Sequence, residues 1–291
     1  MFVASLLTNP ETPVLEPALI ESLRNAWGGG DAVWLMPDVA AEFGLASVPD
    51  NLDSVWADLQ ELKVDVLVHP STGRKKRLLL ADMDSTMIQQ ECIDELADYA
   101  GVGVQVAGIT ARAMNGEIEF EGALRERVGL LKGLDQAVLE SVLAERITYM
   151  PGGKTLLSTM KASGGYAALV SGGFTAFTGP VAEHLGFDEH RSNQFVITGG
   201  VLTGDVIPPI FGKEAKVEAL DDLTAKLGLT DDEVLAVGDG ANDLGMLTRA
   251  GMGVALHAKP SVQAQADFRV NHGDLTALLF LQGYSAEEFV S

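Results

Sequence analysis

The run Leu78-Leu79-Leu80-Ala81-Asp82-Met83-Asp84-Ser85-Thr86 joins four apolar residues directly to two carboxylates spaced two residues apart. A continuous apolar run of this length is typical of a parallel strand that is buried on both faces. Similar runs lie at 166–170, 234–237 and 253–256, and helical patterns separate them at 153–162, 175–185, 215–227 and 244–250. This alternation predicts an α/β fold with a doubly wound parallel sheet.

Residues 1–73 have a different composition, which predicts a separate small α+β domain. They hold all three tryptophans, and eleven carboxylates stand against Arg24 and Lys63. Strand-like runs at 2–7, 32–35 and 65–69 alternate there with helical patterns at 16–26 and 52–62. We therefore predict two domains, 1–73 and 74–291, joined by a polar and basic linker.

Two further segments of the larger domain have patterns of their own. Residues 88–150 form a long, mostly helical insert between the first two parallel strands, and we predict that they cap the carboxyl edge of the sheet. Residues 195–203 predict a β-hairpin with a Gly199-Gly200 turn.

Composition and charge exclude several classes of protein. The 291 residues include 20 Lys and Arg against 41 Asp and Glu, and this net charge of −21 argues against a nucleic-acid partner. No apolar run approaches the roughly 18 residues of a membrane span, and the first seven residues lack the basic part of a signal peptide. The single cysteine, Cys92, excludes an internal disulfide and a cysteine-based zinc site. We expect a cytoplasmic protein with no membrane partner.

Asp82 and Asp84 follow the first predicted parallel strand, at the edge of the sheet where α/β proteins bind ligands. One carboxylate of such a pair can act as a nucleophile, since aspartate forms acyl-phosphates. The other can protonate a leaving oxygen and then deprotonate water. An isolated Asp-x-Asp is more often a solvated turn, so this pair alone does not settle the chemistry.

Gly238-Asp239-Gly240-Ala241-Asn242-Asp243 follows another predicted strand at the same edge. Two more carboxylates beside the first pair need a cation, and hard oxygen ligands of this type suit Mg²⁺. The alternative is a dinucleotide-binding loop, because Gly238-Asp239-Gly240 is a Gly-x-Gly after a strand. Asp243 stands where that loop needs its third glycine and would repel a pyrophosphate.

Two further clusters offer groups for a phosphate. Ser171-Gly172-Gly173 closes a strand and precedes a helix, so its hydroxyl and backbone N–H groups could cradle phosphate, although a plain loop also favours these residues. Lys216 lies at the start of the helix before the Gly238 loop and could neutralise both phosphate and nucleophile. Lys213 is its rival on the same helical face.

Taken in order, the four clusters resemble the haloacid dehalogenase superfamily of phosphatases over about residues 76–285. The resemblance implies a Rossmann-like core in which Asp82 is the nucleophile and Asp84 the acid and base. It also implies Mg²⁺ held by Asp82, the backbone carbonyl of Asp84 and Asp239, with Asp243 orienting this metal shell or Lys216. Asn242 would contact substrate or phosphate, and Lys216 fits the family's lysine better than Lys213 does.

The predicted cap carries residues that would select the substrate. A carboxylate at Glu91 and a guanidinium at Arg127 above one phosphate site would suit a small zwitterion. Arg127 could equally pair with Glu121 or Glu126 on its own helix.

The segments around these residues are similar to those of the phosphoserine phosphatase family. The resemblance implies that Glu91 and Arg127 bind the amine and carboxylate of L-serine. Met114 and Phe120 would form the apolar wall, and Gly172 and Gly173 would contact the substrate. Met83 stands where the family commonly has Phe.

The resemblance implies Mg²⁺-dependent hydrolysis of O-phospho-L-serine to L-serine and phosphate through an aspartyl-phosphate, the last step of serine biosynthesis. Two rivals stay open. One is a phosphatase or phosphotransferase for another small ester, and the other is a non-catalytic amino-acid sensor or scaffold. The resemblance stops at the N-terminal domain, which we expect to be a divergent ACT-like regulatory domain, a plain appendage or a module that forms a homodimer.

Overall fold

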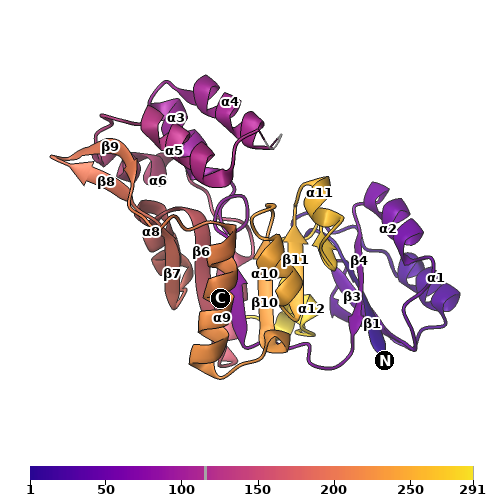
Figure 1. Ribbon diagram of the computed structural model, residues 1–291. Coiled ribbons are helices and arrows are strands. Elements are labelled where there is room, and N and C mark those ends of the chain that lie inside the picture. Colours follow the sequence, from indigo (N-terminus) through magenta and orange to yellow (C-terminus); the bar gives the residue numbers. More distant parts are fainter. Residues whose placement is uncertain (115–116, 291) are drawn as a thin grey trace.

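The computed structural model describes residues 1–114 and 117–290, and its centre is a six-stranded parallel sheet (Figure 1). The strand order is β12-β11-β10-β5-β6-β7. The bounds are β5 (Leu78–Ala81), β6 (Tyr166–Phe174), β7 (Glu189–Asn193), β10 (Val234–Gly238), β11 (Met252–Leu256) and β12 (Phe268–Val270). The predicted α/β fold with a doubly wound parallel sheet is confirmed.

Both faces of this sheet are buried, which explains the continuous apolar runs. In β5, Leu79 and Ala81 pack into one core, and Leu78 and Leu80 pack into the core on the opposite face. The helices that follow the strands cover these faces: α7 (Gly153–Ala162), α8 (Thr175–Leu185), α9 (Lys213–Leu227), α10 (Leu244–Arg249), α11 (Pro260–Gln263) and α12 (Ala277–Leu281). Within the described ranges, none of the helices is long and apolar enough to span a bilayer.

Residues 1–70 form a second, antiparallel sheet in the order β2-β3-β1-β4. Its elements are β1 (Phe2–Leu7), α1 (Pro17–Trp27), β2 (Ala32–Met36), β3 (Ala40–Leu45), α2 (Leu52–Glu61) and β4 (Asp65–Pro70). The βαββαβ order with this strand arrangement is that of a ferredoxin-like domain.

Three strands were missed by the sequence patterns, each for a physical reason. β3 contains Ala40, Ala41 and Gly44, which have low strand propensity. The polar strand β7 lies at the edge of its sheet, and β12 has only three residues. None of these segments shows the apolar pattern on which strand prediction depends.

The two sheets are joined by buried polar contacts. The carboxylate of Asp65 accepts hydrogen bonds from the backbone N–H groups of Asn271 (2.9 Å), His272 (2.8 Å) and Gly273 (2.9 Å), just after β12. Arg74 binds both carboxylate oxygens of Glu42 and also donates to backbone carbonyls beside α12. The N-terminal sheet is therefore held between its own helices and the C-terminal segment of the chain (Figure 1).

Above the carboxyl edge of the parallel sheet lie four helices: α3 (Cys92–Tyr99), α4 (Gly103–Met114), α5 (Phe120–Leu130) and α6 (Ala137–Glu145) (Figure 1). The hairpin β8 (Phe195–Thr198) and β9 (Val201–Val206), with its Gly199-Gly200 turn, packs against them. Backbone hydrogen bonds join Leu202 of β9 to Gly133 and Leu134. The hairpin is therefore packed against these helices, which we call the cap, and forms part of it.

We predict that His69 makes the folded state sensitive to acid. Its ring is buried and contacts the hydroxyl of Ser5 (3.0 Å), and burial, together with the charge of Arg74, lowers its pKa to about 4. The unfolded chain has the higher imidazole pKa of about 6.5, so it binds the proton first. Stability present above pH 6.5 should therefore fall by about 3 kcal/mol as the pH is lowered to 4.

Urea unfolding between pH 7 and 4 would test this, comparing the wild type with His69→Gln and with a control at exposed His184. His69→Gln should flatten the pH dependence, whereas His184→Gln should keep it. An unchanged slope in His69→Gln would contradict the assignment.

Candidate active site

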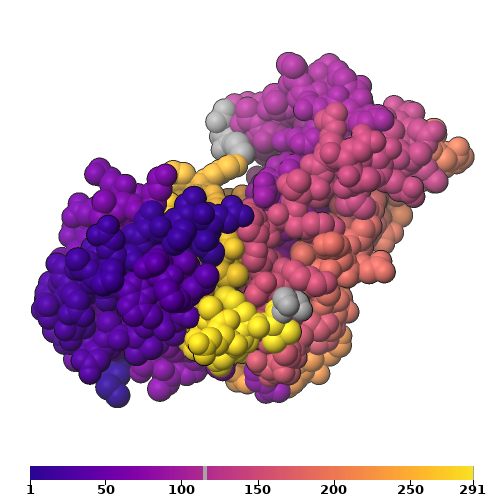
Figure 2. Space-filling model, turned by 180° about the vertical axis from the view of Figure 1, so that it is seen from behind, coloured from indigo at the N-terminus to yellow at the C-terminus, as the bar shows by residue number. Residues whose placement is uncertain are grey.

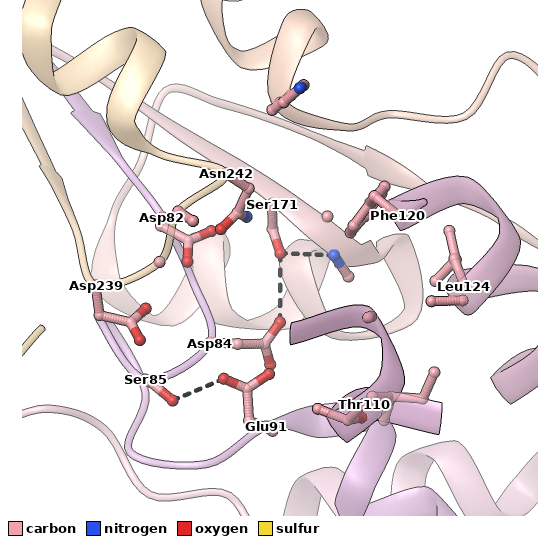
Figure 3. A pocket seen from close by; sticks show the side chains of 18 of the residues that line it. Asp82, Asp84, Ser85, Glu91, Thr110, Phe120, Leu124, Ser171, Asp239 and Asn242 are labelled. Atoms are coloured by element: carbon pink, nitrogen blue, oxygen red, sulfur yellow. Dashed lines mark hydrogen bonds between the residues drawn. The ribbon is translucent and has the colours of Figure 1, made fainter. Parts of the chain in front are cut away.

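A cavity of about 870 Å³ lies between the cap and the carboxyl ends of β5, β6 and β10. Figure 3 shows Asp82 and Asp84 from the end of β5, Ser171 from β6, and Asp239 and Asn242 from the loop after β10. Phe120, Leu124 and Thr110 approach from the cap helices. β5 and β10 are neighbours in the sheet, so their two acidic motifs meet at one point.

Lys216 lies at the centre of the charges under this cavity. Its Nζ is 2.5 Å from Oδ1 of Asp82 and 2.6 Å from Oδ1 of Asp243, and its side chain is fully buried in the first turn of α9. Burial by itself would lower the pKa of Lys216, but the charges of Asp243 and Asp82 raise it above its usual value. The lysine therefore stays protonated. Lys213 lines the cavity but is exposed, 3.5 Å from Glu214.

Asp243 is fixed by the glycines of its own loop. Its Oδ2 accepts the N–H of Gly240 (3.0 Å) while Oδ1 takes the lysine. A Cβ at position 238 would lie 2.4 Å from the Asp243 carboxyl carbon, so only glycine permits this close approach. Asn242 lines the cavity on the same loop.

Asp82, Asp239 and Asp243 form a group that could hold a cation, because one oxygen from each lies within 4.8 Å of the others. Burial and the charges of Asp243 and Glu91 raise the pKa of Asp239 to about 7. Burial and Asp243 likewise raise the pKa of Asp82. A cation would relieve this repulsion, and the all-oxygen donor set fits Mg²⁺.

Asp84 is poised differently from Asp82. Its Oδ1 accepts the backbone N–H of Cys92 (2.8 Å), and its Oδ2 lies 3.4 Å from the Ser171 hydroxyl (Figure 3). Burial, together with the charge of Glu91, raises its pKa to about 6. A carboxyl group with such a pKa can both give and take a proton near neutral pH.

Ser171, Gly172 and Gly173 lie in β6 itself, because this strand continues to Phe174 rather than ending at Val170. Ser171 Oγ accepts the N–H of Gly173 (2.9 Å). A Cβ at Gly172 would lie 3.0 Å from the ring of Phe120, which approaches from the cap. The missing side chains thus let the cap come close to the strand.

The cap arginines have distinct partners. Arg125 pairs with Glu121 (2.8 Å), and Arg112 pairs with Glu126 (2.9 Å). These are the two carboxylates that the sequence offered as alternative partners for Arg127. Within the described residues, Arg127 makes no ion pair. Its Nε donates to the Ala123 carbonyl (3.3 Å), and its terminal N–H groups are available to the cavity that it lines.

Three carboxylates act on the charge of Arg127 without forming an ion pair with it. Burial lowers its pKa, and the charges of Asp94, Glu91 and Asp84 act in the opposite direction. Glu91 accepts a hydrogen bond from Ser85 (2.8 Å), whose backbone has a positive φ of 56° (Figure 3). An arginine and a carboxylate therefore face the same cavity without neutralising each other.

Sequence reasoning missed several residues that line the cavity. They include Ser85, Asp94, Thr110, Leu124 and Lys259. Asp94, Thr110 and Leu124 lie on helices and Ser85 and Lys259 lie in loops, and such residues are too common in these places to give a local signal. The side chain of Met114 lies outside the described part of the chain, so its predicted place in the wall is not described.

Comparison with known proteins agrees with this geometry. Residues 79–248 match the family described as haloacid dehalogenase-like hydrolase. The chain belongs to the haloacid dehalogenase-like hydrolase family. Within it, the chain is 48% identical over 204 residues to a phosphoserine phosphatase of Haemophilus influenzae, covering 70% of this chain. The chain spans 65% of the length of that relative.

Two solved structures extend the comparison. A hydrolase of this family from Salmonella enterica serovar Typhi has a TM-score of 0.87 at 30% identity, covering 97% of this chain and 98% of its own. A substrate-bound phosphoserine phosphatase has a TM-score of 0.66 at 39% identity, covering 71% of this chain and 98% of its own. The first match includes the N-terminal sheet as well as the hydrolase fold.

We predict that Lys216→Met lowers the unfolding free energy by about 3–5 kcal/mol, because it leaves Asp82 and Asp243 buried without a countercharge. Mg²⁺ should restore part of this loss by binding the folded state. Urea unfolding with and without Mg²⁺ measures both effects.

Lys213→Met is the matched control on the same helix, and as an exposed position it should change stability by less than about 0.5 kcal/mol. Equal effects of the two substitutions would show that Lys216 does not balance the buried carboxylates.

Proposed function

We propose that the chain is a Mg²⁺-dependent phosphatase that hydrolyses O-phospho-L-serine to L-serine and phosphate, as the last step of serine biosynthesis. The observation that carries the proposal is the unpaired Arg127 opposite Glu91, in the same cavity as the Asp82–Asp84 pair. The similar proteins named phosphoserine phosphatase support it.

The cap selects the amino-acid part of the substrate. Arg127 binds the α-carboxylate through two N–H groups, and Glu91 binds the ammonium. The phosphate then points toward Asp82, where the Ser171 hydroxyl, the backbone N–H of Gly172, Asn242 and Lys216 supply donors. Phe120 covers the reacting atoms and excludes water.

Asp82 attacks phosphorus through a carboxylate oxygen, and the bond from phosphorus to the serine oxygen breaks. Asp84 is protonated at the start and donates its proton to that oxygen, so L-serine leaves with a neutral hydroxyl group. Asp84 then takes a proton from water, and the resulting hydroxide attacks the aspartyl-phosphate and regenerates Asp82. Asp82, Asp239 and the backbone carbonyl of Asp84 would hold Mg²⁺, which would supply positive charge to stabilise the phosphate, and Asp243 orients Lys216.

The N-terminal domain enters the proposal as a regulatory or oligomerisation unit. We place its boundary at residue 73, with a cap over 88–150 in the remaining 74–291. Its βαββαβ order supports an ACT-like domain. A homodimer and a cytoplasmic location complete the proposal.

We predict that Asp82→Asn lowers phosphate release from L-phosphoserine by more than about 1000-fold, because the amide cannot act as the nucleophile. The melting temperature should change by less than about 5 °C, since the shape is kept and Lys216 retains Asp243. Exposed Asp53→Asn is the control and should leave turnover unchanged. Near-wild-type activity of Asp82→Asn would exclude this mechanism.

We predict that Arg127→Ala lowers kcat/KM for L-phosphoserine by about 100-fold or more, while hydrolysis of p-nitrophenyl phosphate is kept. Arg125→Ala removes a guanidinium from the same helix whose partner is exposed Glu121, so it should affect neither substrate.

Phosphate release should also be measured with D-phosphoserine, L-phosphothreonine and glycerol phosphate as substrates, each in the presence of Mg²⁺ and of EDTA. Equal loss on all substrates would mean that Arg127 is structural. Metal-dependent release without preference for L-phosphoserine would leave a phosphatase of another small ester.

A further inference from the structure

A second cavity, of about 370 Å³, lies between the N-terminal domain and the parallel-sheet domain. Both domains line it with polar side chains: Asn9, Thr12, Lys63, His257, Asn271 and His272. It adjoins the interdomain contact at Asp65, which holds the backbone of 271–273. No residue of the proposed reaction lines it.

Lys63 brings a positive charge without a partner to this cavity. The chain has 41 carboxylates and 20 lysines and arginines, and most described cations are paired. The ammonium of Lys63 makes no ion pair or hydrogen bond within the described residues. Arg127, which lines the active-site cavity, makes no ion pair within the described residues either, although its Nε donates to the Ala123 carbonyl (3.3 Å). Each cavity is therefore lined by a positively charged side chain that makes no ion pair within the described residues.

Asn271 and His272 contribute buried polar atoms with no protein partner. The Nε2 of Gln60 donates a hydrogen bond to the Val64 carbonyl, which fixes the orientation of the Gln60 amide. The Oε1 of Gln60 then accepts a hydrogen bond from the Nδ2 of Asn271 (2.7 Å). The Oδ1 of Asn271 is left without a donor, and the Nε2 of His272 also lacks a partner in the described chain. Such atoms are rare in folded proteins and call for a ligand or solvent partner.

Two residues that line this cavity have a left-handed backbone conformation. Lys63 and His257 have positive φ values of 58° and 47°, and Ser85 in the active site has 56°. His257 is held by a hydrogen bond from Nε2 to the Gly273 carbonyl (2.8 Å). At Lys63 this conformation ends α2, because the Val64 N–H donates to the Leu59 carbonyl (3.0 Å).

We propose that the interdomain cavity binds a small oxyanion, a carboxylate or phosphate group, whose charge is balanced by Lys63. The side-chain amide N–H of Asn9 and the imidazole N–H of His272 can donate to its oxygens. The Oδ1 of Asn271 can accept a hydrogen bond from a hydroxyl or ammonium of the same molecule. This site is independent of the proposed phosphatase activity.

The site is connected to the active site through one short segment, 257–262. His257 lines the interdomain cavity, whereas Lys259, Ser261 and Val262 line the active-site cavity. In Figure 2 this orange-yellow segment lies between the N-terminal domain and the cap. We expect a bound anion to shift this segment and with it Lys259 at the wall of the active-site cavity.

Hydrogen exchange of the full chain, measured by mass spectrometry, locates binding. Inorganic phosphate and acetate are the probes, because they separate a phosphate group from a carboxylate. We expect slower exchange in 8–12 and 257–273 with at least one of them. The change in 239–243 through the connecting segment should be lost in Lys63→Met, whereas phosphate bound in the active site itself would change 239–243 in both proteins. Lys63→Met should weaken this binding by about tenfold or more.

Lys132→Met is the matched control, because Lys132 is also exposed and without an ion pair in the described chain but lines neither cavity. It should leave the protection intact. Protection that persists in Lys63→Met, or no protection of 8–12 and 257–273 with either probe, would overturn the site. Protection there with no change in 239–243 would overturn the coupling alone.

Turnover of L-phosphoserine without added anion should be equal in Lys63→Met and the wild type. Because exchange is read without turnover, a failure of the phosphatase proposal and a failure of this site give different results.

Discussion

The hydrolase domain depends on one buried ammonium between two carboxylates. Lys216 has no exposed side-chain surface, and transfer of a lone charge to such a place would cost several kcal/mol. Asp82 from β5 and Asp243 after β10 offset this cost, so the contact ties α9 to two neighbouring strands. The same three groups then leave an excess of negative charge at the strand ends, which favours a cation and, through it, a phosphate.

Selectivity and chemistry come from different layers of the molecule. The strand ends hold the acidic pair rigidly, because β5 and β10 are buried on both faces. In the proposed function the cap supplies the groups that recognise the substrate, and Phe120 of the cap lies against Gly172 at the strand ends. Arg125 and Arg112 bind the cap carboxylates Glu121 and Glu126, which leaves Arg127 without an ion pair within the described residues.

The N-terminal domain is part of the same folded unit through shared packing. Leu7 and Leu67 belong to the core that also contains α12, while Ala4 and Leu6 pack beneath the domain's own helices. Strand β1 is therefore buried on both faces although it belongs to an antiparallel sheet. Asp65 adds a directional contact, and the polar cavity beside it gives the interface a place where a ligand can act on both domains.

The sequence by itself determined the parallel sheet, the hairpin and the strand-end motifs, because burial on both faces and turn chemistry leave local patterns. It could not show β3, β7 or β12, because β3 is rich in alanine and glycine, β7 is polar and β12 has only three residues. Spacing alone left Lys213 as an alternative to Lys216, and Glu121 and Glu126 as partners for Arg127, although the family resemblance favoured Lys216 and a substrate-binding Arg127. Tertiary structure decided these, because burial and ion pairing depend on which side chains other elements bring within reach.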